Sequence, residues 1–91
     1  MSSKIRLENL VALKLPPLGA EKGGKALLIR WNFAQGQNIE EGQEIVELEA
    51  EKCAFAVESP GKGILEEILS HEGDSIEEGQ TMAYMRIKKH D

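Results

Sequence analysis

The chain has 91 residues, which is enough for one small domain spanning residues 1–91. Its formal net charge of -5 disfavours binding to nucleic acid or to an anionic membrane, and 41% apolar with 30% charged residues is a soluble, globular composition. No apolar run reaches the ~20 residues that span a bilayer, the first ten residues lack a signal-peptide core, and a single cysteine excludes an internal disulfide. We therefore expect an intracellular domain that is stabilised by packing alone.

Six short apolar or alternating runs, bounded by Gly, Pro, Asn or Ser, predict β-strands. They span residues 11–15, 26–33, 44–50, 54–58, 63–69 and 81–87. The core is therefore expected within about residues 11–87, with tails at 1–10 and 88–91. Between the first two strands lies the main exposed loop, which lacks the strand, Gly-Lys-Ser/Thr and helix context of a phosphate-binding loop.

The third and fourth predicted strands form a tight hairpin. In residues 44–50 the apolar and acidic side chains alternate, and Phe55 and Val57 continue the apolar face in the next strand. Only Glu51, Lys52 and Cys53 are left to turn the chain between them. This places Lys52 at or near the tip, where an exposed lysine is a candidate attachment point.

The prediction of the fifth strand, residues 63–69, rests on an internal duplication of the sequence. Residues 64–69 have the spacing of an amphipathic helical turn when they are read alone. However, residues 36–49 and 73–86 align with a shift of 37 positions, and the same shift places 64–69 on the β-branched and aromatic run 27–32. Six aligned pairs are identical: Gly36/Gly73, Ile39/Ile76, Glu40/Glu77, Glu41/Glu78, Gly42/Gly79 and Gln43/Gln80. The duplication predicts a two-fold symmetric β-domain, with the four glycines at positive φ in turns and both isoleucines buried.

Other candidate sites do not assemble in the sequence. His71 with Asp74 as an acid–base pair, or with His90 as metal ligands, has no third partner, so we expect surface histidines and no metal site. Lys89 is the equivalent of Lys52 under the shift, but it lies in a charged tail with no strand after it, and we expect it to be unmodified. No nucleophile, base and oxyanion donors are grouped, so we expect no catalytic residues and no independent enzyme activity.

Residues 48–61, LEAEKCAFAVESPG, resemble the modification hairpin of the biotinyl/lipoyl attachment domains, in particular the lipoyl domains of 2-oxo acid dehydrogenase acyltransferases. Residues 15–19 resemble the opening motif of that family, Trp31 falls at its usual tryptophan, and Gly36 lies 16 residues before Lys52. The resemblance covers roughly residues 11–87. It implies an all-β, flattened barrel (sandwich) of two four-stranded antiparallel sheets with pseudo-two-fold symmetry, the hammerhead type, with the lysine turn at one end and the termini near the other.

The same resemblance implies a covalent cofactor on Lys52. Biotin carriers flank their lysine with methionines, whereas Glu51 and Cys53 flank Lys52 here, with Glu49 three positions upstream, an arrangement that resembles that of lipoyl domains. We therefore expect a lipoyl carrier, or swinging-arm, domain. The alternatives are a biotin carboxyl carrier and an unmodified interaction module.

As a lipoyl domain, the chain is expected to serve a 2-oxo acid dehydrogenase-type complex in the cytoplasm or the mitochondrial matrix, as a monomer when isolated. The implied partners are a thiamin-diphosphate-dependent decarboxylase, a dihydrolipoamide acyltransferase, a dihydrolipoamide dehydrogenase and a lipoate ligase. In related domains the loop after the first strand lies beside the lysine turn. Recognition is accordingly assigned to Glu49, Glu51 and Cys53 and to the segment from residue 20 to residue 25, which includes Ala20, Glu21, Lys22 and Gly23.

The sequence departs from the family pattern at a few positions. Glu51 and Cys53 replace the usual aspartate and small residue around the lysine, the first loop is about one residue longer, and Ala26 replaces a glycine whose counterpart, Gly63, is retained. We interpret Cys53 as a small residue in an alanine slot, since Lys52 is its only basic neighbour in the sequence.

Overall fold

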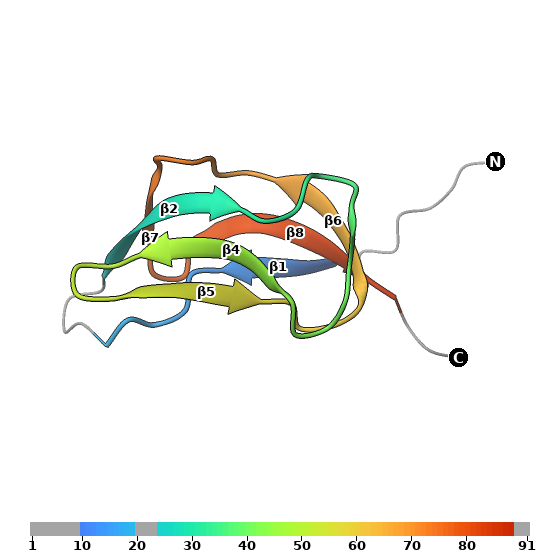
Figure 1. Cartoon of the computed structure of the whole chain (residues 1–91), viewed down its shortest axis with the longest axis horizontal. Helices are drawn as coiled ribbons and strands as arrows, with labels where there is room; N and C mark the ends of the chain where they lie inside the picture. The colour runs from blue at the N-terminus through green and yellow to red at the C-terminus, as the bar shows by residue number, and fades with distance from the viewer. Residues whose placement is uncertain (1–9, 20–23, 89–91) are drawn as a thin grey trace.

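The computed structural model describes residues 10–19 and 24–88, and the described chain is built from strands without a helix (Figure 1). Two antiparallel four-stranded sheets have the orders β1-β8-β6-β3 and β5-β4-β2-β7. Their strands are β1 (Leu10–Lys14), β2 (Lys25–Trp31), β3 (Asn38–Ile39), β4 (Glu44–Glu49), β5 (Ala54–Glu58), β6 (Gly63–Ile68), β7 (Ser75–Glu77) and β8 (Thr81–Ile87). This confirms the predicted all-β fold of two four-stranded sheets. No helix in the described residues is long and apolar enough to cross a membrane.

The six predicted strands are all present, two with the predicted bounds and four with ends that differ by one or two residues. Leu10, which we assigned to a tail, is the first residue of β1. Residues 63–68 form a strand, so the interpretation from the duplication was right and the local helical spacing was misleading. Strands β3 and β7 were not predicted, because two or three residues are too few to show an alternating pattern.

The two halves of the chain repeat each other in hydrogen bonding as well as in sequence. The β2–β4 pair shifts register between Leu28 and Arg30, and the β6–β8 pair does so between Leu65 and Glu67, which is 37 positions later. The Leu28 amide donates to Asp74 O at 2.9 Å, and its counterpart, the Leu65 amide, donates to Gln37 O at 3.1 Å. The pseudo-two-fold symmetry predicted from the duplication is therefore present in the backbone itself.

Two apolar clusters fill the space between the sheets. Ile39 and Ile76 are both fully buried, one in each cluster, as predicted. Trp31 packs against both clusters, and its indole N–H donates to Ser70 O at 2.9 Å. Burial of such side chains contributes about 1.5–3 kcal/mol each, so the repeated isoleucines anchor the two halves equally. The buried members are Leu15, Ala26, Leu28, Val46, Leu48, Ile76 and Met82 in one cluster, and Leu13, Ile39, Ile45, Leu65, Ala83 and Met85 in the other.

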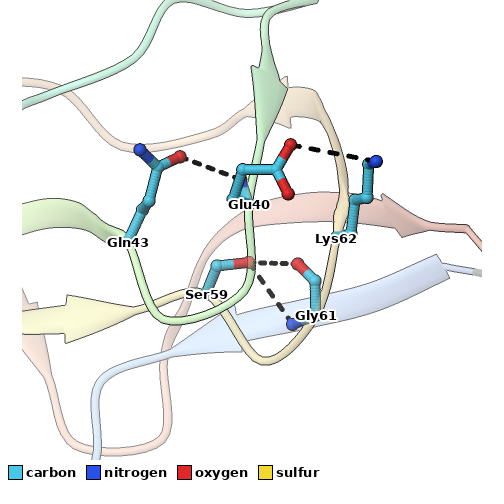
Figure 2. A network of polar contacts seen from close by, with 5 residues as sticks. All are labelled: Glu40, Gln43, Ser59, Gly61 and Lys62. Carbon is cyan, nitrogen blue, oxygen red and sulfur yellow. Dashed lines mark hydrogen bonds and ion pairs between the residues drawn. The ribbon is translucent and has the colours of Figure 1, made fainter.

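The repeated Gly-x-x-Ile-x-x-Gly segments form matching turns. Their glycines have φ between 80° and 92°, the left-handed region that glycine enters at low cost. In the first turn the Glu40 amide donates to Gln43 Oε1 at 2.8 Å (Figure 2), and in the second the Glu77 amide donates to Gln80 Oε1 at 3.0 Å. Figure 2 also shows the neighbouring turn, where Ser59 Oγ donates to Gly61 O at 2.6 Å. The four positive-φ glycines of the duplication, Gly36, Gly42, Gly73 and Gly79, confirm the prediction for them.

Candidate attachment site at the lysine turn

Lys52 lies in the turn that joins β4 to β5, at the left end of the molecule in Figure 1. The Ala50 amide donates to Cys53 O at 2.8 Å, which makes Glu51 and Lys52 the two central residues of the turn. Glu51, Lys52 and Cys53 are all exposed. The predicted hairpin and the placing of Lys52 at its tip are therefore confirmed.

The base of the turn is held by the core. Glu49 pairs with Ala54 and Leu48 with Phe55 across the hairpin. Leu48 is fully buried, and the half-buried Phe55 packs against the same cluster. An exposed lysine thus extends from a fixed strand pair, and its amine sits on a four-carbon stem with free rotation. This arrangement suits covalent attachment, because the backbone position is set while the side chain can move.

An open groove of about 760 Å³ separates the turn from the loop that follows β1. Its described lining consists of Leu18, Gly19, Gly24 and Lys25 on one side and residues 50–53 on the other. Lys25, the last residue of the predicted recognition segment, is therefore beside the turn. Ala20, Glu21, Lys22 and Gly23 lie outside the described residues. Leu18 and Gly24 were not among the predicted site residues, although Leu18 belongs to the segment 15–19 that resembles the opening motif of the family.

Glu78 fixes the described ends of that loop. Its carboxylate accepts the Leu18 amide at 2.7 Å, and its backbone amide donates to Gly24 O at 3.0 Å. Hydrogen bonds to a charged acceptor are stronger than those between neutral groups. The rim of the groove is consequently tied to the turn between β7 and β8.

Carboxylates dominate the hairpin beside Lys52. Glu49 and Glu51 are exposed next to the lysine. Glu47 lies further from the turn in β4, with its Oε1 at 3.7 Å from Arg30 Nε. The two predicted recognition carboxylates therefore lie where a partner that approaches Lys52 meets them. Cys53 is an exposed free thiol at the end of the same turn.

His71 and Asp74, which we did not expect to form a site, lie together in a turn. The backbone amide of His71, not its ring, donates to Asp74 Oδ2 at 2.8 Å, and both residues are exposed. Within residues 10–19 and 24–88, no group of three His, Cys, Asp or Glu side chains could hold a metal ion. Lys89 and His90 lie outside the described residues.

A flattened two-sheet barrel that presents a lysine at the tip of the β4–β5 hairpin defines the class of attachment domains that carry a covalent cofactor. The family model Biotin_lipoyl, described as "Biotin-requiring enzyme", matches residues 11–85. The chain belongs to this biotinyl/lipoyl attachment family.

Two curated relatives agree with that assignment. The chain is 38% identical over 71 residues to the dihydrolipoyllysine-residue succinyltransferase component of the 2-oxoglutarate dehydrogenase complex of Staphylococcus saprophyticus, covering 78% of this chain and 16% of the relative. It is 33% identical over 76 residues to the dihydrolipoyllysine-residue acetyltransferase component of the acetoin cleaving system of Bacillus subtilis, covering 82% and 19%. The chain thus spans less than one fifth of the length of either relative.

Two solved structures share the fold at low sequence identity. The lipoyl domain of the 2-oxoglutarate dehydrogenase complex from Azotobacter vinelandii superimposes with a TM-score of 0.69 at 21% identity, covering 82% of this chain and 95% of that one. A single-chain, multi-domain long-chain acyl-CoA carboxylase gives a TM-score of 0.75 at 16% identity, covering 98% and 8%. A lipoyl domain and a carboxylase share this architecture, so the fold alone does not identify the cofactor.

Proposed function

We propose that this chain is a lipoyl carrier domain, with lipoate joined in amide linkage to Lys52. The observation that carries the proposal is the exposed Lys52 at the centre of the β4–β5 turn, flanked by Glu51 and Cys53 instead of methionines. The curated relatives above are named for dihydrolipoyllysine residues, which supports lipoate over biotin.

The residues around Lys52 fit a lipoyl group. The amine is exposed for acylation, and acylation removes its charge without removing a buried contact. The adjoining groove of about 760 Å³ offers the apolar side chains of Leu18 and Ala50 beside the attachment point. When bound, the group supplies redox and acyl-transfer chemistry that no side chain of this domain provides.

The domain would contribute position and not catalysis. Strands β4 and β5 hold the backbone of residue 52, and the side-chain stem gives reach. Tethering raises the effective concentration of a carried group at each site that the arm can reach. We accordingly assign the chain the role of moving acyl groups and reducing equivalents between active sites of a 2-oxo acid dehydrogenase-type complex.

The partners follow from that role. The arm would meet a thiamin-diphosphate-dependent decarboxylase, an acyltransferase and a dihydrolipoamide dehydrogenase, after a lipoate ligase has modified it. Glu49, Glu51 and the segment from residue 20 to residue 25 are proposed to orient the lysine for these enzymes. Two observations support this proposal: the carboxylates beside Lys52 are exposed, and Lys25 forms part of the groove wall next to the turn.

The proposal is tested by producing the domain with a lipoate ligase and a biotin ligase in cells supplied with both cofactors. Intact-mass measurement and peptide mapping should find one lipoyl group per chain, on Lys52. Lys52→Arg should abolish the modification. Lys62→Arg, which changes a lysine that pairs with Glu40 at 3.9 Å in the network of Figure 2, should leave it complete. A bare Lys52, or biotin on Lys52, would contradict the proposal.

A further inference from the structure

The two halves of the domain differ beside Lys52. In the second half, β6 and β8 form five pairs, which begin with Gly63 opposite Ile87. A shift of 37 positions reproduces four of them between β2 and β4, but the fifth, Ala26 opposite Ala50, is absent. The Lys88 amide also donates to Lys62 O at 2.8 Å, whereas the described residues show no equivalent bond from the Glu51 amide to Lys25 O.

The steric cause of this difference lies at the aligned pair Ala26 and Gly63. A methyl group on Gly63 would lie 2.1 Å from Arg86 O, so β6 and β8 approach too closely there for any side chain. Ala26 occupies the equivalent place and carries that methyl group, buried at 3% exposure in the core. The backbone of β4 at Glu49, the counterpart of Arg86, cannot approach β2 as closely. Strand β2 instead gains a pair on its other side, Lys25 opposite Glu77.

The missing pair leaves the lysine turn separated from the start of β2. The groove described above occupies this place, since Gly24 and Lys25 line one wall and Ala50 with the turn lines the other. Leu18 and Ala50 are half-buried apolar side chains that pack against the core at this point. Its volume of about 760 Å³ lies within the range of about 300–1,000 Å³ that is usual for small-molecule sites.

We propose that this groove is a resting site for the dithiolane end of a lipoyl group on Lys52, and that Ala26 is the positioning residue that keeps it open. The inference rests on the proposed function. The occupant is the domain's own arm, because Lys52 itself lines the groove and the chain and ring of lipoate are apolar apart from the amide. Contact with Leu18 and Ala50 removes that apolar surface from water and holds the arm beside Gly24 and Lys25.

The test compares the unmodified and lipoylated domain, each as wild type and as Ala26→Gly, by ¹⁵N NMR and amide hydrogen exchange. In the wild type, lipoylation should shift the amide signals of Leu18, Gly24 and Ala50. In Ala26→Gly the ladder should extend, so that the Glu51 amide bonds to Lys25 O and exchanges at least roughly tenfold more slowly. The lipoylation-dependent shifts should then fall below half of the wild-type values.

Two further variants separate a loss of stability and a loss of the apolar groove wall from the effect of Ala26. Ala83→Gly removes a methyl group buried in the other cluster, so it should lower stability without changing the Glu51 exchange or the lipoylation shifts. Leu18→Ser keeps the backbone bond to Glu78 but removes the apolar wall, so the lipoylation shifts should shrink while Glu51 exchange stays fast.

The outcomes separate the two proposals. Mass spectrometry of the same samples reports whether Lys52 carries lipoate, and a bare lysine refutes both the function and the resting site. Lipoate on Lys52 with unperturbed groove signals in the wild type refutes the resting site alone. Shifts of wild-type size in Ala26→Gly, together with a slowed Glu51 amide, refute the role of Ala26.

Discussion

At the scale of single residues, the carboxylates beside Lys52 are exposed on the same hairpin as the proposed modification site. Exposed charges contribute about 0.2–1 kcal/mol to an interaction, so their removal should have a modest effect. We predict that Glu49→Gln lowers the rate of lipoylation by a ligase roughly twofold to fivefold, as measured by mass spectrometry over time.

The matched control for that substitution is Glu44→Gln. Glu44 is also exposed, but it lies at the opposite end of β4 and pairs with Glu58. It should leave the lipoylation rate within error of the wild type. Equal rates for both variants would remove Glu49 from the recognition surface.

Cys53 offers a second test at this scale. The turn uses its backbone carbonyl, which accepts the Ala50 amide, and its side chain is exposed. Cys53→Ala is therefore expected to change the free energy of unfolding by less than about 0.5 kcal/mol and to leave the rate at which a lipoyl group on Lys52 is reduced unchanged. A changed reduction rate would show instead that the thiol takes part in the chemistry of the arm.

At the scale of strands, Gly63 and Gly73 are required for different reasons. A side chain at Gly63 would meet the backbone of Arg86, whereas Gly73 has open space around it but a φ of 91°. Gly63→Ala forces β6 and β8 apart and should cost about 2–3 kcal/mol, near the top of the range for overpacking. Gly73→Ala only enters the left-handed region and should cost about 1–2 kcal/mol.

Urea unfolding followed by Trp31 fluorescence measures both free energies, since the indole lies between the two clusters. Equal losses for the two variants would mean that the strands around Gly63 relax around the added methyl group.

The same strands show what the sequence could and could not predict. Residues 64–69 are ambiguous by periodicity, and only their alignment with residues 27–32 identifies the strand. The turn at Lys52 is a local feature and was predicted correctly. The groove could not be predicted, because its two walls, Leu18 with Gly24 and the lysine turn, are more than 25 residues apart in the sequence. The replacement at Ala26 was visible in the sequence, but its consequence required the strand register.

At the scale of the whole molecule, the symmetry extends to the outer strands. The five pairs between β1 and β8 correspond in order to the five between β5 and β4, including the register shift near the last pair. The lysine turn closes one of these strand pairs. The other pair, in which Leu10 lies opposite Arg86, has no such turn between its strands. Its open end is at the other end of the barrel from the β4–β5 turn (Figure 1).

We expect this open pair to make the force that unfolds the domain depend on the direction of pulling. A force that separates the start of β1 from the end of β8 acts across the strands, along their hydrogen bonds. It therefore breaks these bonds one after another. A force between Lys52 and the end of β8 acts along the strands and loads many bonds at once. Single-molecule pulling should therefore unfold the domain at a clearly lower force through handles at Leu10 and Lys88 than through handles at residue 52 and Lys88. Equal unfolding forces for the two handle pairs would contradict this prediction. The expected difference means that the barrel resists unfolding more strongly when the force is applied through the arm on residue 52.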